Sequence, residues 1–247
     1  MYRFCTSLGI VIALSIVHHT TPPSFAQDDG DDALVEMVVE LLGDADKDMR
    51  SIALEQIRSE VPGEAATKKF ATLLPNLKSD VQVELVRALT DRADSAARPA
   101  IIELLKSSDD TDVRVAAIRA LGFLGNNDDL SLLLKWLGSD SKEEAAEART
   151  SLIRLPGQSF TQAMIAHLKQ GEPSLRVALM DILVARRAST AAQEMLPLAI
   201  DQDREVRAAA VKALGQLAAP EHISGMVKAI LVAQRGRERE SVEKAVM

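Results

Sequence analysis

The sequence predicts an all-α protein, an α-solenoid of six helix pairs with part of a seventh. Three observations lead to this prediction: the composition, a repeat of 31 to 32 residues, and two helical patterns within each repeat. Hydrophobic residues are 47% of the 247 residues and aromatic residues only 3%, which favours helices over strands. Charged residues are 26%, as in an ordinary soluble domain.

The first 26 residues have the pattern of a secretory signal peptide. Arg3 precedes an apolar run at 8–17, and small residues at Ser24 and Ala26 suit a cleavage site after Ala26. The run is shorter than the roughly 20 apolar residues that span a bilayer, so we expect cleavage and no membrane span afterwards. An uncleaved anchor is the alternative. We therefore expect an exported protein, periplasmic or extracellular, and a bacterial source because no cysteine follows residue 26.

The two ends of the repeat region differ in the sequence. Residues 27–32 contain four aspartates and predict a solvated acidic leader, with Asp32 capping the first helix. The solenoid is expected over 33–247. At Met247 the seventh repeat stops before its second core position. Because a solenoid normally ends in a polar capping repeat, we expect the chain to be a fragment of a longer protein.

One position, the anchor, recurs through the chain and defines the repeat. The segment 112–122 reads Asp-Val-Arg-Val-Ala-Ala-Ile-Arg-Ala-Leu-Gly, and 205–215 reads Glu-Val-Arg-Ala-Ala-Ala-Val-Lys-Ala-Leu-Gly. The anchor is the first Val of each segment, and six copies lie 31 or 32 residues apart, with a seventh 36 residues further on. The anchors are Met49, Val81, Val113, Glu144, Leu175, Val206 and Val242. Only Glu144 among them is not apolar.

Each anchor lies on an amphipathic helix. Residues four and eight places after it are Ala, Leu or Ile in six copies, and these positions share one helix face with the anchor. Three places before it, Asp46, Asp110 and Asp203 can accept hydrogen bonds from the N–H groups of the first turn. Another helical pattern lies upstream, as in 99–106 and 129–137, so each repeat holds a first and a second helix.

These residues resemble the HEAT repeat, in particular the short class typified by phycobilisome-lyase-like proteins, an armadillo-type solenoid. The element Asp-x-x-Val-Arg-x-x-Ala-x-x-Ala-Leu-Gly is complete at 110–122 and 203–215 and in phase elsewhere. The resemblance implies that the second helices line the concave side and that Asp and Arg of successive turns form a ladder, interrupted at Gln82 and Ala145. The implied ladder residues are Arg50, Arg114, Arg176, Arg207, Asp46, Asp110 and Asp203.

No pattern in the sequence predicts a catalytic, cofactor or metal site. His167 and His222 are the only histidines after residue 26 and belong to different repeats. The Asp109–Asp112 cluster lacks the Gly and Glu of an EF-hand loop and favours a helix cap. Nucleophile elbows, phosphate loops and dinucleotide fingerprints do not occur. Trp136, the one tryptophan, is expected in the core between repeats.

The sequence therefore predicts a non-enzymatic scaffold whose concave face binds a protein or peptide. Nucleic acid is not an expected partner, because the formal net charge is -7 and the concave row mixes signs. Two alternatives remain: the arm of a larger exported enzyme, and a lyase- or oxidoreductase-type activity by analogy with the family. The possible contacts, six places after each anchor, are Glu55, Arg87, Arg119, Thr150, Asp181 and Lys212.

Overall fold

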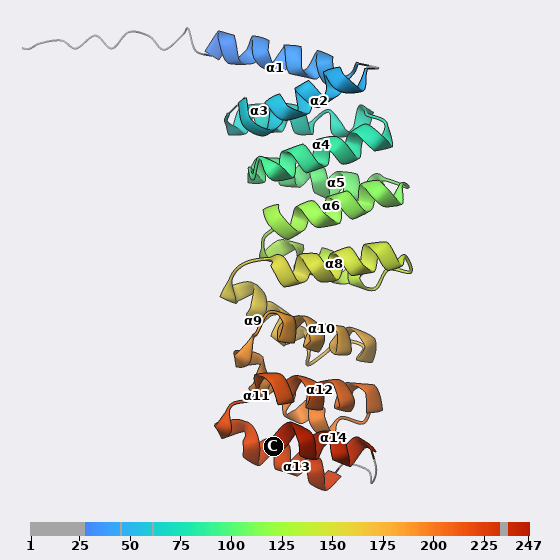
Figure 1. The fold of residues 1–247 in the computed structure, drawn as a ribbon, viewed down its shortest axis with the longest axis vertical. Helices are drawn as coiled ribbons and strands as arrows, with labels where there is room; N and C mark the ends of the chain where they lie inside the picture. The colour runs from blue at the N-terminus through green and yellow to red at the C-terminus, as the bar shows by residue number, and fades with distance from the viewer. Residues whose placement is uncertain (1–27, 45, 61, 233–236) are drawn as a thin grey trace, which may run out of the picture.

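The computed structural model describes residues 28–44, 46–60, 62–232 and 237–247. In this part of the chain, seven helix pairs without strands are stacked into an elongated rod (Figure 1). The all-α solenoid predicted from the sequence is thereby confirmed. The predicted signal peptide and its cleavage site lie outside the described residues. No helix in the described ranges is long and apolar enough to cross a membrane.

The helices of each pair alternate along the chain. The first helices are α1 (Asp28–Leu42), α3 (Glu64–Ala71), α5 (Arg98–Ser107), α7 (Leu130–Leu137), α9 (Gln158–His167), α11 (Ala192–Met195) and α13 (Ile223–Val232). The second helices are α2 (Lys47–Glu55), α4 (Ser79–Asp91), α6 (Thr111–Leu124), α8 (Lys142–Arg154), α10 (Pro173–Ala185), α12 (Arg204–Leu217) and α14 (Arg237–Val246). A π-helical turn, Gln56–Glu60, extends α2.

The core follows the predicted helix face. The residues four and eight places after the anchors are buried in all six copies. Their members are Ala53, Leu85, Ala117, Ala148, Leu179 and Ala210 in one row and Ile57, Leu89, Leu121, Leu152, Leu183 and Leu214 in the other. The alanines, four of six in the first row, let neighbouring helices approach closely, while the larger Leu and Ile side chains fill the space between them.

Met49 departs from this pattern. It is 42% exposed, so its expected place in the core is wrong. Anchors face the preceding repeat, because the fourth anchor, Glu144, contacts Arg114 of the third. Among the described residues no second helix precedes α2, so nothing covers Met49 on that side.

Aspartates begin several second helices, as predicted. Oδ1 of Asp110 accepts the N–H groups of Asp112 and Val113 at 2.9 and 3.2 Å. Asp203 accepts two N–H groups of its own first turn, and Asp46 accepts one. These bonds satisfy donors that have no partner within the helix. The Asp109–Asp112 cluster is therefore a helix cap.

The acidic leader is a second correction. Helix α1 already begins at Asp28, four residues before the cap expected at Asp32. Acidic residues in a first turn interact favourably with the partial positive charge of the helix N-terminus. The four aspartates that suggested a solvated leader are for this reason compatible with a helix start.

Two glycines mark close contacts between second helices. A Cβ built on Gly122 of α6 would lie 2.7 Å from Oγ and 2.9 Å from Cα of Ser151 on α8. At the same repeat position, a Cβ on Gly215 of α12 would lie 3.3 Å from Cβ of Ala245 on α14. Both helices continue through their glycine, so these residues serve tight packing rather than a bend.

Candidate binding face formed by the second helices

The second helices lie one beside the next along the rod (Figure 1). We call the outer surface formed by α4, α6, α8, α10, α12 and α14 the second-helix face. Two grooves lie on it, one between α4 and α6 and one between α12 and α14. Residues two and six places after the anchor line both grooves, so the repeat itself generates these hollows at equivalent positions.

The α4–α6 groove has a volume of about 560 Å3 and carries both signs of charge. Arg87 and Arg119 supply its positive charge. Hydrogen bonds from the backbone of Val113 and the hydroxyl of Ser79 hold the pKa of Asp110 below its usual value, so this carboxylate stays charged at neutral pH. The acidic residues of the groove are Asp80, Glu84, Asp110 and Asp112.

The α12–α14 groove is of similar volume, about 570 Å3, but its charge has one sign. Its cations are Arg204, Arg207, Lys212 and Lys244, and among the described residues no acidic side chain lines it. Val211 and Val242 form an apolar floor and are 5% and 3% exposed. Lys212 belongs to the contact row predicted from the sequence, and Arg207 to the implied ladder. Arg204 and Lys244 were not predicted, because they lie outside the single row six places after each anchor.

Some residues of the predicted contact row line these grooves, and two members of the row, Lys212 and Asp181, form an ion pair with each other. Arg87, Arg119 and Lys212 line the grooves. Nζ of Lys212 also lies 3.2 Å from Asp181, and Arg119 lies 2.7 Å from Glu147 of the next repeat.

The other three members of the row, Glu55, Thr150 and Asp181, do not line either groove. Glu55 pairs with Arg58 three places along its own helix, with Arg58 Nη1 3.3 Å from Glu55 Oε2. The hydroxyl of Thr150 donates to the carbonyl of Ala146 in its own helix. Binding by the row remains a prediction.

The ladder implied by the family resemblance takes a different form. Arg50, Arg114 and Arg207 each donate to a backbone carbonyl six residues earlier, in the turn of their own repeat. Arg114 and Arg176 also reach the next repeat, at Glu144 and Asp201 rather than at capping aspartates. The caps accept N–H groups of their helices, which leaves other carboxylates to bridge the repeats.

The interruptions expected at copies two and four are only partial. Gln82 takes the place of the arginine in copy two, and its amide donates to the carbonyl of Leu74 in the preceding turn. Ala145 has no polar group, but its neighbour Glu144 receives Arg114. The polar column therefore continues through both copies with different side chains.

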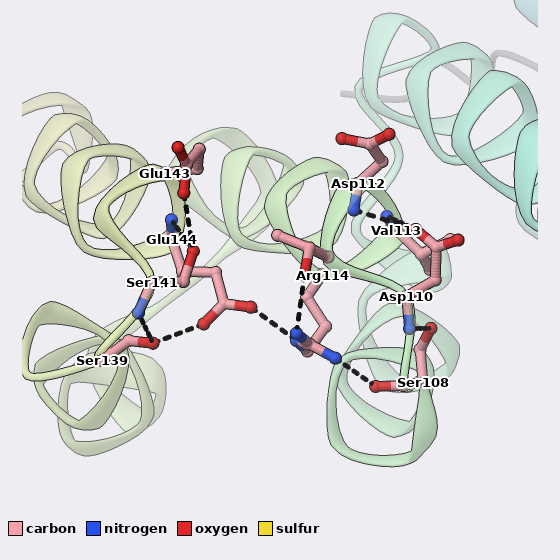
Figure 2. A network of polar contacts seen from close by, with 10 residues as sticks. Ser108, Asp110, Asp112, Val113, Arg114, Ser139, Ser141, Glu143 and Glu144 are labelled. Atoms are coloured by element: carbon pink, nitrogen blue, oxygen red, sulfur yellow. Dashed lines mark hydrogen bonds and ion pairs between the residues drawn. The ribbon is translucent and has the colours of Figure 1, made fainter.

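Glu144 is the centre of a buried polar cluster (Figure 2). It is 2% exposed, and Nε of Arg114 donates to its Oε1 at 2.6 Å. The hydroxyl of Ser139 donates to its other oxygen, and the hydroxyl of Ser141 accepts its backbone N–H. The Arg114 guanidinium lies 5.8 Å from the ring centre of Trp136, which is half-buried against the core as expected. These contacts link repeats three and four.

A second buried ion pair joins the same two repeats through their first helices. Arg98, at the start of α5, donates from Nε and Nη2 to the two oxygens of Asp129 at 2.7 and 2.8 Å. Asp129 is 2% exposed and precedes α7. Hydrogen bonding to this carboxylate raises the pKa of Arg98. In the sequence Asp129 stands at the start of the helical pattern 129–137, and no local pattern indicates its pairing with Arg98.

Two further arginines, which the sequence analysis missed, cap the preceding second helix. Arg186 donates to the carbonyls of Leu152, Ile153 and Leu155 at the end of α8, at 2.6 to 2.9 Å. Arg92 donates to the carbonyl of Ile57, in the π-helical turn that extends α2, and to that of Gly63, directly before α3. Burial lowers the pKa of both arginines. A cation at a helix C-terminus compensates carbonyls that lack a partner.

The signal for these arginines is a motif that recurs after three repeats. Pro-Gly occurs at 62–63 and 156–157, with a threonine four residues after each glycine. Gly63 and Gly157 have φ of 99° and 105°, which favours glycine, and Arg92 and Arg186 contact the two threonines. The Pro-Gly motif is present in only two repeats, so it does not stand out from the repeat period of 31 to 32 residues.

His222 and Asp94 are titratable residues that serve structural contacts. Within those ranges no three His, Cys, Asp or Glu side chains are close enough together to hold a metal ion. Nδ1 of His222 accepts the backbone N–H of Ala219 at 2.9 Å, which caps a short 3-10 turn, Pro220–His222. The hydroxyl of Thr67 donates to the carboxylate of Asp94, and this hydrogen bond lowers the pKa of Asp94. The contact joins neighbouring repeats.

Family models agree with this geometry. A model described as HEAT repeats matches residues 67–153, from α3 to α8, and a HEAT repeat model matches residues 193–219. The chain is a HEAT-repeat helical solenoid. A search of curated protein sequences finds no match.

Solved structures of low sequence identity are similar to this chain. Human deoxyhypusine hydroxylase shares 17% identity over 89% of this chain and 96% of its own, with a TM-score of 0.42. A complex of CpcE and CpcF of phycocyanin lyase from Nostoc sp. shares 15% over 86% and 93%, with a TM-score of 0.45. A designed armadillo repeat protein in complex with the peptide (KR)4 shares 19% over 87% and 99%, with a TM-score of 0.37. The assignment itself rests on the family models and the stacked helix pairs.

Proposed function

We propose that the protein is an exported, non-enzymatic HEAT-repeat scaffold that binds a protein or peptide through its second-helix face. The observation that carries this proposal is the pair of grooves at equivalent repeat positions on that face. Stacked repeats expose an extended surface, and a partner can contact several repeats at once. The two grooves differ in charge, which supplies a means of selecting the partner and its direction.

Polar side chains that join the repeats differ from those that line the grooves. The polar contacts described above join each repeat to its neighbour, whereas the groove residues Arg87 and Arg204 are in no ion pair among the described residues. Side chains with structural partners hold the rod together. Arg87 and Arg204 have no such partner in the described part of the chain and are available to a second molecule within the grooves.

The experiment is capture of a partner with the full chain from the envelope fraction of the source organism. We expect one protein to be recovered in stoichiometric amount by the wild type and lost with Arg87→Glu/Arg204→Glu. The matched control is Lys135→Glu/Lys228→Glu, which reverses two exposed cations on first helices and should retain the partner. Equal recovery by both variants would place binding away from the second-helix face, and repeated failure of the wild type would refute the scaffold.

Export and the absence of enzymatic activity are tested on the same material. Export rests on the signal pattern of 1–26, and it predicts a mature protein in the envelope fraction whose N-terminal sequence begins at Gln27. A cytoplasmic protein that retains residues 1–26 would contradict it. Visible absorbance or bound metal in the purified protein would instead favour a lyase- or oxidoreductase-type activity.

A further inference from the structure

The α12–α14 groove is cationic in a chain whose formal net charge is -7. Arg204 and Lys244 are exposed, and neither is in an ion pair among the described residues. Glu243, beside Lys244 in the sequence, pairs with Arg239 at 3.1 Å and does not line the groove. Among the described side chains of α14, none therefore forms an ion pair with Lys244.

The other two cations are fixed in position. Nη1 of Arg207 donates to the carbonyls of Asp201 and Gln202 at 2.9 Å each. Lys212 lies 3.2 Å from Asp181, a carboxylate that also faces Arg149 at 3.9 Å. Asp181 thus stands between two cations and neutralises Lys212 only in part. A ligand in this groove meets positive charge from both helices.

The floor of the groove adds an apolar requirement. Ala208, Val211, Val242 and Ala245 lie between the cations, and the absence of a side chain at Gly215 keeps α12 and α14 close together there. Pockets of roughly 300–1,000 Å3 take ligands of drug size, so about 570 Å3 accommodates a few side chains. Nucleic acid would leave this floor unused, and the acidic chain would repel it.

We infer that the α12–α14 groove binds a short acidic peptide segment of the partner, with an aliphatic side chain on the floor and carboxylates on either side. The inference rests on the proposed function, because it names the class of partner for one part of the second-helix face. The carboxylates face Arg204 and Lys244 at the exposed rim and Arg207 and Lys212 on α12. The α4–α6 groove, which carries four acidic residues, does not bind such a segment.

The test is fluorescence anisotropy with the full chain and three labelled hexapeptides. Glu-Glu-Leu-Val-Glu-Glu is expected to bind, Lys-Lys-Leu-Val-Lys-Lys is not, and Glu-Glu-Ser-Ser-Glu-Glu should bind more weakly because it leaves the floor empty. Arg204→Ala/Lys244→Ala should weaken binding about fivefold to tenfold, as expected for the loss of two partly exposed ion pairs. Ala208→Glu, at an exposed position in the groove, should abolish binding.

The control variant is Lys135→Ala/Lys228→Ala, which removes the same charge from first helices and should leave binding unchanged. Equal binding of the basic peptide, an unchanged affinity in Ala208→Glu, or tighter binding of a single-stranded oligonucleotide would overturn the inference. Self-association of the wild type that Arg204→Ala/Lys244→Ala abolishes would also overturn it, since a second copy would then fill the groove. If the acidic peptide binds but no partner is captured, only the proposed function is refuted. If a partner is captured but the acidic peptide does not bind, only this inference is refuted.

Discussion

Glu144 is a carboxylate at a position that is apolar in the other six copies, and it is buried. Burial of a charge is unfavourable unless an opposite charge and hydrogen bonds compensate it. Here the Arg114 guanidinium and the hydroxyl of Ser139 do so. In turn Glu144 compensates Arg114, whose side chain is 19% exposed and lies against Trp136. Each member of this pair therefore depends on the other.

Glu144→Ala is expected to lower the free energy of unfolding by about 3 kcal/mol, because it leaves the Arg114 charge largely buried without its carboxylate. Urea denaturation followed by circular dichroism measures this loss. Glu143→Ala is the control, since Glu143 is exposed and should change stability by no more than about 0.5 kcal/mol. Similar losses in both variants would show that the buried Arg114–Glu144 pair contributes no more to the free energy of unfolding than an exposed carboxylate does.

Gly122→Ala tests close packing between α6 and α8. Alanine favours a helix over glycine by about 1 kcal/mol, but its Cβ would clash with Ser151. We expect the clash to prevail and stability to fall by about 1–3 kcal/mol.

Thermal denaturation measures the effect, with Gly138→Ala as the control because its added Cβ meets nothing closer than 3.6 Å. Ser151→Ala should not rescue Gly122→Ala, since Cα of Ser151 is also within 2.9 Å. A stabilised Gly122→Ala protein would contradict this account of the glycine.

Much of the residue-scale structure could be predicted from the sequence, because burial repeats with the helix period. The two core rows and the capping aspartates follow from local rules of that kind. The partner of Glu144 does not, since Arg114 lies 30 residues away and no local rule connects the two. The predicted burial of Met49 was wrong, because the sequence pattern shows which face of a helix is apolar but not whether a neighbouring helix covers that face.

At the scale of the helix pair, side chains of the second helices hold the turns and link the repeats. Arg176 crosses from repeat five to Asp201, which begins the turn before α12, at 2.6 Å. The N–H of Asp203 donates to the same carboxylate. The sequence predicted Arg176 as a ladder residue through the family resemblance. It did not predict Asp201 as its partner, because the resemblance implied the capping aspartates.

The Arg176–Asp201 contact predicts a dependence of stability on pH. Burial acts to raise the pKa of Asp201, but its hydrogen bonds with Arg176 and Asp203 outweigh burial and lower the pKa. The unfolded value is about 3.9, so in the interval below it the unfolded state binds more protons. The stability that Asp201 contributes is present above about pH 3.9 and is lost as pH falls through the lower folded pKa.

Thermal denaturation of the wild type and Asp201→Asn between pH 2.5 and 7 measures this effect. We expect the difference in Tm to be greatest at neutral pH and to shrink below about pH 4. Arg176→Met should reduce the same pH-dependent difference, because it removes the cation that favours the charged carboxylate. A difference in Tm that is constant with pH would contradict the role of the charge.

Across the whole molecule, the contacts between repeats are uneven. Repeats three and four are joined by Arg98–Asp129, by Arg114–Glu144 and by the approach of Gly122 to Ser151. Repeats four and five have less contact between their second helices, α8 and α10. There the turn at Gly157 precedes α9, and Arg186 holds the end of α8. Because each repeat contacts only its neighbours, the least extensive interface decides where a solenoid opens first.

Arg186→Met should therefore loosen the rod at one place. It removes donors to three carbonyls and to Thr161, which we expect to lower the local opening free energy by about 2 kcal/mol. Amide exchange in α9 and the start of α10 should then be about 30-fold faster, whereas α6 and α4 should change little. Hydrogen exchange with mass spectrometry on the full chain resolves these segments.

Arg187→Met is the matched control, because Arg187 is exposed and the variant keeps a non-glycine residue at φ 55°. Faster exchange spread evenly over all helices would show a uniformly cooperative rod, and unchanged exchange would show that the bonds of Arg186 contribute nothing. Exchange confined to the junction would instead place a point of bending between the two grooves. The α4–α6 and α12–α14 grooves lie on opposite sides of that junction along the chain, so its stiffness sets how well one partner can occupy both.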